Sequence, residues 1–132
     1  PGPKLREGDM QVPEGFYRIE LLNPNSLYHL SLRVNYPNDF DRRMAREEGR
    51  SNLGGDIMIH GSDVSIGCLA MGDEAIEEIF VLAADTGLKG ISVVLSPYDF
   101  RQGYILPRLT HKSEWVSTLH RNLQEFLKNL PD

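Results

Sequence analysis

The chemistry available to this sequence centres on one thiol and a nearby imidazole. Cys68 is the only cysteine of the chain, and His60 stands eight positions before it. A thiol attacks a carbonyl as its thiolate, and a neighbouring imidazole can take the proton because its own pKa lies near neutrality. A lone cysteine is also commonly a small buried hydrophobic residue. The spacing alone therefore allows two interpretations, a catalytic pair or an inert core thiol.

The residues around this pair predict how it is held. The run from 56 to 60 is largely apolar and predicts a buried strand with the histidine at its tip. Gly61 lets the chain turn, and Gly67 lets the backbone approach closely just before the cysteine. Such a loop can set the thiol beside the imidazole. It can also aim the backbone N–H groups of Ile66, Gly67 and Cys68 at a developing oxyanion.

A family resemblance favours the catalytic interpretation. The pattern consists of His60-Gly61, then Ser65-x-Gly67-Cys68, then Met71 and Asp73 before a predicted helix. It resembles the signature of the YkuD-type L,D-transpeptidases, and more closely their compact YafK-like branch, in which the loop between histidine and cysteine is short. Further matches to that branch are Pro13-Glu14-Gly15-x-Tyr17, Ser26-x-x-His29 and Tyr36-Pro37-Asn38.

The resemblance implies a mostly β (α+β) fold, the L,D-transpeptidase catalytic fold, in which β-sheets carry two or three packed helices. It implies an enzyme of the bacterial periplasm or cell envelope that acts on peptidoglycan stem peptides. Cys68 would attack the carbonyl of meso-diaminopimelate and form a thioester, and His60 would hold or receive the thiol proton. The carbonyl of Gly61 would orient the imidazole. Ser65 would shape the loop, and the N–H groups around Gly67 would bind the oxyanion.

Two positions depart from the family pattern. Ile66 stands where most members have a second histidine, and Ala70 stands where they usually have an arginine. An arginine at such a site suits a carboxylate on the donor stem, so its absence implies different donor recognition. Transpeptidation, hydrolysis of the stem, and hydrolytic release of a lipoprotein covalently attached to peptidoglycan all stay open. A non-catalytic cell-wall-binding module is the alternative of another class.

Composition and charge limit the class of protein. The 132 residues are 40% hydrophobic and 25% charged with a formal net charge of −5, which predicts a single globular domain over residues 1–132. No Lys/Arg run is dense enough to predict nucleic-acid binding, and no apolar run is long enough to predict a membrane span. The potential metal ligands around Cys68 lack the close spacing of a zinc site, so we expect neither a metal nor a cofactor.

The cysteine count and the localisation point in different directions. One cysteine excludes an intrachain disulfide and mildly favours a reducing compartment, whereas the resemblance implies the envelope. No signal peptide is visible. We expect the native precursor to carry a targeting segment that this sequence lacks.

Hydrophobic periodicity predicts the remaining elements. Strands are predicted at 16–22, 27–36 and 91–95, and the first two form a hairpin around a turn at 23–26. Helices are predicted at 38–48, at 73–86 with Gly87 as the stop, and at 113–130. Residues 1–11 are predicted to form an N-terminal arm, 50–55 a flexible loop, and 99–112 an irregular segment.

Four polar residues are candidates for substrate binding. In the strand 27–36, alternation puts His29 and Arg33 on one polar face, which is either simply solvated or one rim of a substrate groove. Asp41-Arg42 stands where YafK-like sequences also carry Asp-Arg. This pair is either a structural ion pair or a substrate contact.

Overall fold

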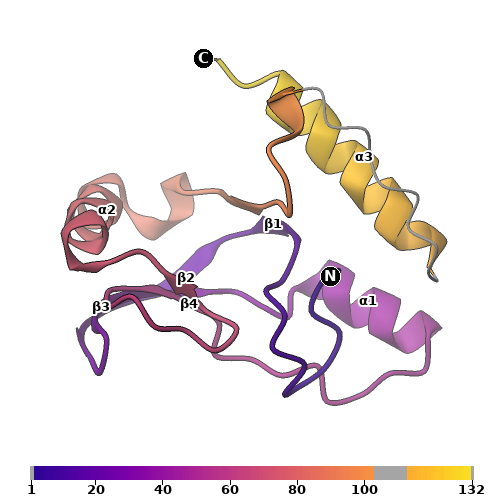
Figure 1. Cartoon of the computed structure of the whole chain (residues 1–132), viewed down its shortest axis with the longest axis horizontal. Coiled ribbons are helices and arrows are strands. Elements are labelled where there is room, and N and C mark those ends of the chain that lie inside the picture. The colour runs from indigo at the N-terminus through magenta and orange to yellow at the C-terminus, as the bar shows by residue number, and fades with distance from the viewer. Residues whose placement is uncertain (1, 103–112, 132) are drawn as a thin grey trace.

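The strands of the molecule lie between helices at its two ends. The computed structural model describes residues 2–102 and 113–131. The strands are β1 (Gly15–Tyr17), β2 (Ile19–Ser26), β3 (His29–Val34), β4 (Met58–His60), β5 (Leu69–Ala70) and β6 (Val93–Leu95). The α-helices are α1 (Asp39–Glu47), α2 (Asp73–Thr86) and α3 (Glu114–Lys128), and two short 3-10 turns are η1 (Leu88–Gly90) and η2 (Phe100–Gln102). In Figure 1, α2 lies at one end of the molecule, and α1 and α3 lie at the other.

The strands form two sheets. β1 pairs with β6, and the larger sheet has the order β2-β3-β4-β5. All of these pairs are antiparallel except β4 with β5, which is parallel. The predicted α+β fold of sheets with packed helices is confirmed. The predicted strand 16–22 is in fact two strands with different partners, because β1 leaves the larger sheet to pair with β6.

Helix α2 packs on the larger sheet and supplies much of the main core. Ile76 and Ala83 are buried among the strand residues, while Ile79 and Phe80 pack at the edge of the same cluster. The helix ends at Gly87, whose φ of 83° is readily accessible only to glycine. This helix directly follows the loop that carries the cysteine, so its burial fixes one end of that loop.

Helices α1 and α3 build the other end of the molecule. Asn38 caps α1, and its side chain accepts a hydrogen bond from the backbone N–H of Asp41. In α3, Leu119 and Leu123 are buried against Phe100. Toward the C-terminal end of α3 the helix is more open, since Phe126 is 40% exposed.

The hairpin of β2 and β3 differs from the prediction. The turn lies at residues 27–28 rather than at 23–26, so β2 continues through Pro24 to Ser26. Proline lacks the N–H of a regular ladder, but the pairing is irregular between Asn23 and Ser26, so no ladder bond is lost there. The predicted strand 56–60 likewise begins later, at Met58, because Asp56 has a φ of 53°.

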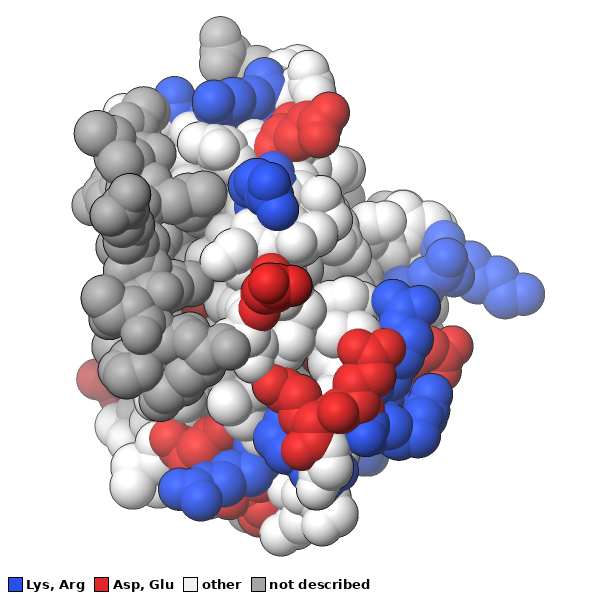
Figure 2. Space-filling view, turned by 90° about the vertical axis from the view of Figure 1, so that its right-hand side faces the viewer, with Lys and Arg blue, Asp and Glu red and all other residues white. Residues whose placement is uncertain are grey.

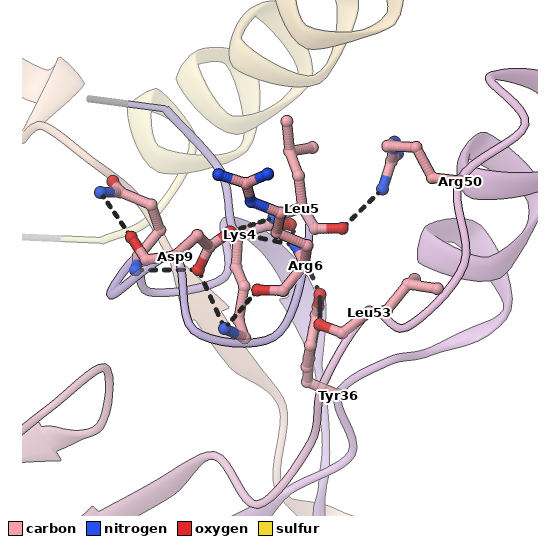
Figure 3. Close-up of polar contacts among 8 residues, drawn as sticks. Lys4, Leu5, Arg6, Asp9, Tyr36, Arg50 and Leu53 are labelled. Atoms are coloured by element: carbon pink, nitrogen blue, oxygen red, sulfur yellow. Dashed lines mark hydrogen bonds and ion pairs between the residues drawn. The ribbon is translucent and has the colours of Figure 1, made fainter.

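The N-terminal arm is a packed loop held by hydrogen bonds (Figure 3). Lys4 is buried, and its Nζ contacts Asp9 Oδ1 at 2.9 Å. Partial burial raises the pKa of Asp9, but the backbone N–H groups of Leu5 and Arg6 and the Lys4 ammonium outweigh it and lower the pKa to about 2. The arm also binds the predicted flexible loop, since Arg50 donates to the carbonyl of Leu5 at 2.9 Å.

Charges are mixed on the surface that Figure 2 shows, where Lys and Arg side chains lie among Asp and Glu side chains. Within residues 2–102 and 113–131, no helix combines the length and apolar character needed to cross a bilayer.

Candidate active site

His60 is the last residue of β4, and its ring is fixed by the residue that follows. Its Nδ1 lies 2.5 Å from the carbonyl oxygen of Gly61. A carbonyl can only accept, so Nδ1 carries the proton, and Nε2 of the neutral ring is the nitrogen that is able to take one. His60 is only 1% exposed, which limits the movement of the ring.

Cys68 lies immediately before β5, two residues before the strand partner of His60. The register pairs Ile59 with Leu69 and His60 with Ala70. Directly paired residues share a face, so the Ala70 side chain lies on the face of the imidazole. Cys68 precedes Ala70 by two residues, in a bend outside the strand.

The thiol is half-buried and has a backbone partner. Cys68 Sγ donates to the carbonyl oxygen of Asp56 at 3.5 Å. To become a nucleophile, the thiol must turn from Asp56 toward the imidazole.

Two hydrogen bonds hold the loop between the two residues. Ser65 Oγ donates to the carbonyl of Cys68 at 2.5 Å, and the backbone N–H of Ser62 donates to Asp73 Oδ1 at 2.8 Å, which joins the loop to the start of α2. Gly67 has a φ of 80°, a value that other residues rarely adopt. Ile66 is 83% exposed and stays clear of the core.

Tyr28 covers the imidazole, a contact that the sequence did not reveal. Its ring centroid lies 4.6 Å from that of His60, with an interplanar angle of 30°. Tyr28 belongs to the hairpin turn, where strand alternation does not predict the direction of a side chain. A histidine and a turn tyrosine so far apart in sequence carry no local signal of contact.

His29 and Arg33 share a polar face by alternation but bind different partners. His29 Nε2 lies 2.7 Å from Glu77 Oε1 of α2. Arg33 lies 3.0 Å from both Glu20 Oε1 and Asp56 Oδ1. Between them, Ser31 is 2% exposed, so this face is not simply solvated.

Arg33 and Arg42 line one cavity of about 610 Å³, whereas Asp41 does not join them. The carboxylate of Asp41 accepts a hydrogen bond from the Tyr17 hydroxyl at 3.0 Å and another from the backbone N–H of Asn38. Burial raises its pKa despite these donors. Asp41 therefore has a structural position at the start of α1. A larger cavity, of about 710 Å³, lies among β1, α1 and α3 and contains none of the candidate residues.

Comparison with known proteins gives relatives in sequence and in structure. The chain is 42% identical over 103 residues to the L,D-transpeptidase candidate YafK of Escherichia coli, in strain K12 and in O157:H7. The match covers 76% of this chain but 39% of the relatives, so the chain spans about two fifths of their length.

Two solved structures of the helical cell shape determining protein Pgp2 from Campylobacter jejuni share the fold. The first superposes with a TM-score of 0.57 at 18% identity and covers 99% of this chain and 58% of that one. The K307A variant gives 0.56 at 22% identity, over 95% of this chain and 41% of that one. The family model for the L,D-transpeptidase catalytic domain, YkuD, matches residues 2–94. The chain therefore belongs to the YkuD family of L,D-transpeptidase catalytic domains.

Proposed function

We propose that this domain is a cysteine-dependent enzyme that acts on peptidoglycan stem peptides in the bacterial envelope, with Cys68 as nucleophile and His60 as general base and acid. The observation that supports the proposal is the sheet register, which pairs His60 with Ala70, two residues after Cys68. The hydrogen bond from His60 to Gly61 adds to it, because it leaves Nε2 able to take a proton. Membership of the YkuD family supports the choice of substrate class.

The reaction has two halves. Cys68 gives its proton to His60 Nε2, and the thiolate attacks the carbonyl carbon of meso-diaminopimelate. The bond from that carbon to the nitrogen of the next residue breaks, Nε2–H protonates the leaving amine, and a thioester remains. Water or an amine then attacks the thioester, and the sulfur leaves and regains its proton. Water gives hydrolysis, and an amine gives transpeptidation.

The loop before the cysteine is suited to bind the oxyanion of each tetrahedral intermediate. The φ of 80° at Gly67 turns the backbone directly before the nucleophile. In the proposed mechanism, the N–H groups of Gly67 and Cys68, with that of Ile66, donate to the oxyanion. The bond from Ser65 to the carbonyl of Cys68 fixes the loop in this conformation.

Hydrolytic release of a covalently attached lipoprotein is the second candidate. The observation that favours it is Ala70, which lies directly opposite His60 in the β4–β5 register. A methyl group there cannot bind the carboxylate that an arginine would bind, so the donor differs from that of most family members. This candidate uses the same thioester chemistry and changes only the leaving group.

Product masses test the proposal. The protein is incubated with tetrapeptide-stem muropeptides and, separately, with lipoprotein-linked wall fragments, with Cys68→Ala as the control. Crosslinked dimers or exchanged terminal residues indicate a transferase, and shortened stems or freed lipoprotein indicate a hydrolase. Cys68→Ala should abolish every product while its thermal unfolding stays near that of the wild type. Binding of both substrates with no product would identify a wall-binding module and refute the enzyme.

A further inference from the structure

Arg33 lies on the same face of the sheet as His60, one of the two proposed catalytic residues. In the β3–β4 register, Ser31 pairs with His60 and Arg33 pairs with Met58. Because residues two apart share a face, the Arg33 side chain leaves the sheet on the side of His60. Within the described strands β3, β4 and β5, Arg33 is the residue on this face that carries a permanent positive charge.

We infer that Arg33, together with Arg42, forms a subsite for a carboxylate of the donor peptide. This inference rests on the proposed function, because that function supplies the peptide. The two guanidinium groups line the same cavity of about 610 Å³, and a guanidinium binds a carboxylate through two parallel hydrogen bonds. Asn35 lines it as well and offers amide N–H donors, whereas the amide of Asn38, also in the lining, donates to the carbonyl of Phe16 at 3.0 Å.

The cavity also contains the acidic side chains of Glu20 and Asp39, which pair with the two arginines. Arg33 contacts Glu20, and Arg42 lies 3.7 Å from Asp39. The carboxylates are exposed, since Glu20 is 48% and Asp39 fully open to solvent. Exposed pairs of this kind contribute little to stability, so a ligand carboxylate can displace them at low cost.

The second partner of Arg33 connects the subsite to the nucleophile. Asp56 Oδ1 lies 3.0 Å from Arg33, and the side chain of Asp56 is 80% exposed. The carbonyl oxygen of the same residue is the one that accepts from Cys68 Sγ. A carboxylate that replaces Asp56 on Arg33 therefore binds next to the residue whose backbone carbonyl contacts the thiol. Arg33 would supply the charge that the family pattern places at position 70, which is Ala70 here.

Two carboxylates of a tetrapeptide stem could occupy the subsite, the side-chain carboxylate of meso-diaminopimelate or the carboxylate of the terminal residue. Calorimetric titration can separate them when Cys68→Ala is used, because binding is then measured without turnover. Three synthetic tetrapeptides serve as probes: the free acid, the peptide amidated at its terminus, and the peptide amidated on the diaminopimelate side chain.

We expect one of the two amidations to weaken binding on the order of tenfold, as expected for losing a charge-assisted bidentate contact. Arg33→Gln in the same background should weaken the free acid by a similar factor and remove the effect of that amidation. Arg33→Lys should give an intermediate loss of affinity, because lysine keeps the positive charge but cannot donate two parallel hydrogen bonds to a carboxylate. Arg46→Gln is the matched control, since it removes an exposed positive charge of α1 outside the cavity and should leave binding unchanged.

Equal binding of all three peptides would overturn the inference, and so would full binding by a folded Arg33→Gln variant. The amidation comparison needs no arginine variant. Equal binding of the three peptides therefore overturns the inference even if the Arg33→Gln variant fails to fold. The proposed function is tested separately. The mass of the intact wild-type protein is measured after incubation with the free acid, and a mass increase equal to that of the acyl group indicates a thioester. If the thioester forms but amidation has no effect on binding, the proposed enzyme is supported and the subsite is refuted. If amidation weakens binding but no thioester forms, the subsite is supported and the proposed enzyme is refuted.

Discussion

Gly61→Ala tests whether the carbonyl beside His60 is positioned by close packing. A Cβ at this position would lie 2.6 Å from Asp73 Oδ1, 2.7 Å from the backbone oxygen of Tyr28 and 3.1 Å from the Cβ of His29. The first atom also accepts the loop hydrogen bond of Ser62, and the second belongs to the hairpin backbone. Neither can move away without disturbing a structure that contacts the site.

The size of the effect follows from these distances. Contacts below 3 Å must lengthen by roughly half an ångström or more before they cease to be repulsive. Overpacking of this kind costs about 1–3 kcal/mol of stability. If the Gly61 carbonyl moves with the strain, the imidazole moves with it, and misplacement approaching 1 Å reduces turnover on the order of a hundredfold. We expect a loss of tenfold or more in kcat.

The matched control is Gly87→Ala, at the end of α2. Gly87 has a φ of 83° and nothing near its missing Cβ, so alanine there strains the backbone by about 1–3 kcal/mol without a clash and outside the site. Urea unfolding gives the stability of both variants, and iodoacetamide alkylation of Cys68 between pH 5 and 9 gives the thiol pKa and reactivity.

Both variants should lose stability, but only Gly61→Ala should shift the alkylation profile and slow turnover. An unchanged alkylation profile and normal turnover in Gly61→Ala would refute the reasoning that packing at Gly61 sets the position of His60. Equal losses of turnover in both variants would attribute the effect to stability alone.

Three further outcomes are expected. His120→Ala should lower the free energy of unfolding in urea by about 3–5 kcal/mol, because the buried carboxylate of Glu14, 2.6 Å from His120 Nε2, would lose its partner. A loss below about 1 kcal/mol would contradict this expectation. Tyr28→Ala should slow turnover severalfold by uncovering His60, whereas Tyr28→Phe keeps the ring and should retain it. Asp9 has a pKa of about 2 against an ordinary 3.8, so its charged form favours folding and stability should fall as the pH drops from about 4 to 2. Asp9→Asn should flatten this part of the curve of stability against pH, as measured by thermal unfolding.

The elements that sequence reasoning found depend on local signals. Asn38 before a charged run indicates a helix start, and Gly87 after an apolar stripe indicates a helix end, because capping and left-handed backbone involve only neighbouring residues. Local signals were insufficient where pairing with distant residues sets the bounds of an element. The sequence predicts β1 and β2 as one strand, and only their pairing with β6 and β3 separates them.

The candidate site divides in the same way. Cys68, His60 and the carbonyl of Gly61 could be named from residue types and a motif, because they lie within nine residues of each other. Asp41 could be named too, but its contact with Tyr17 is made across the fold and gives it a structural position. The arm at residues 1–11 showed no pattern, yet the buried Lys4 and its partner Asp9 order it.

By itself, the sequence identified the groups of the proposed chemistry: one thiol, one imidazole, a short glycine-containing loop and the helix behind it. These depend on residue type and on spacing along the chain. The tertiary structure decided which groups surround that pair. Tyr28 reaches His60 through a hairpin turn, and Arg33 reaches Asp56 across the sheet, because strand pairing joins residues that are remote in sequence. No local periodicity encodes such contacts, since the register is set by the packing of the whole core.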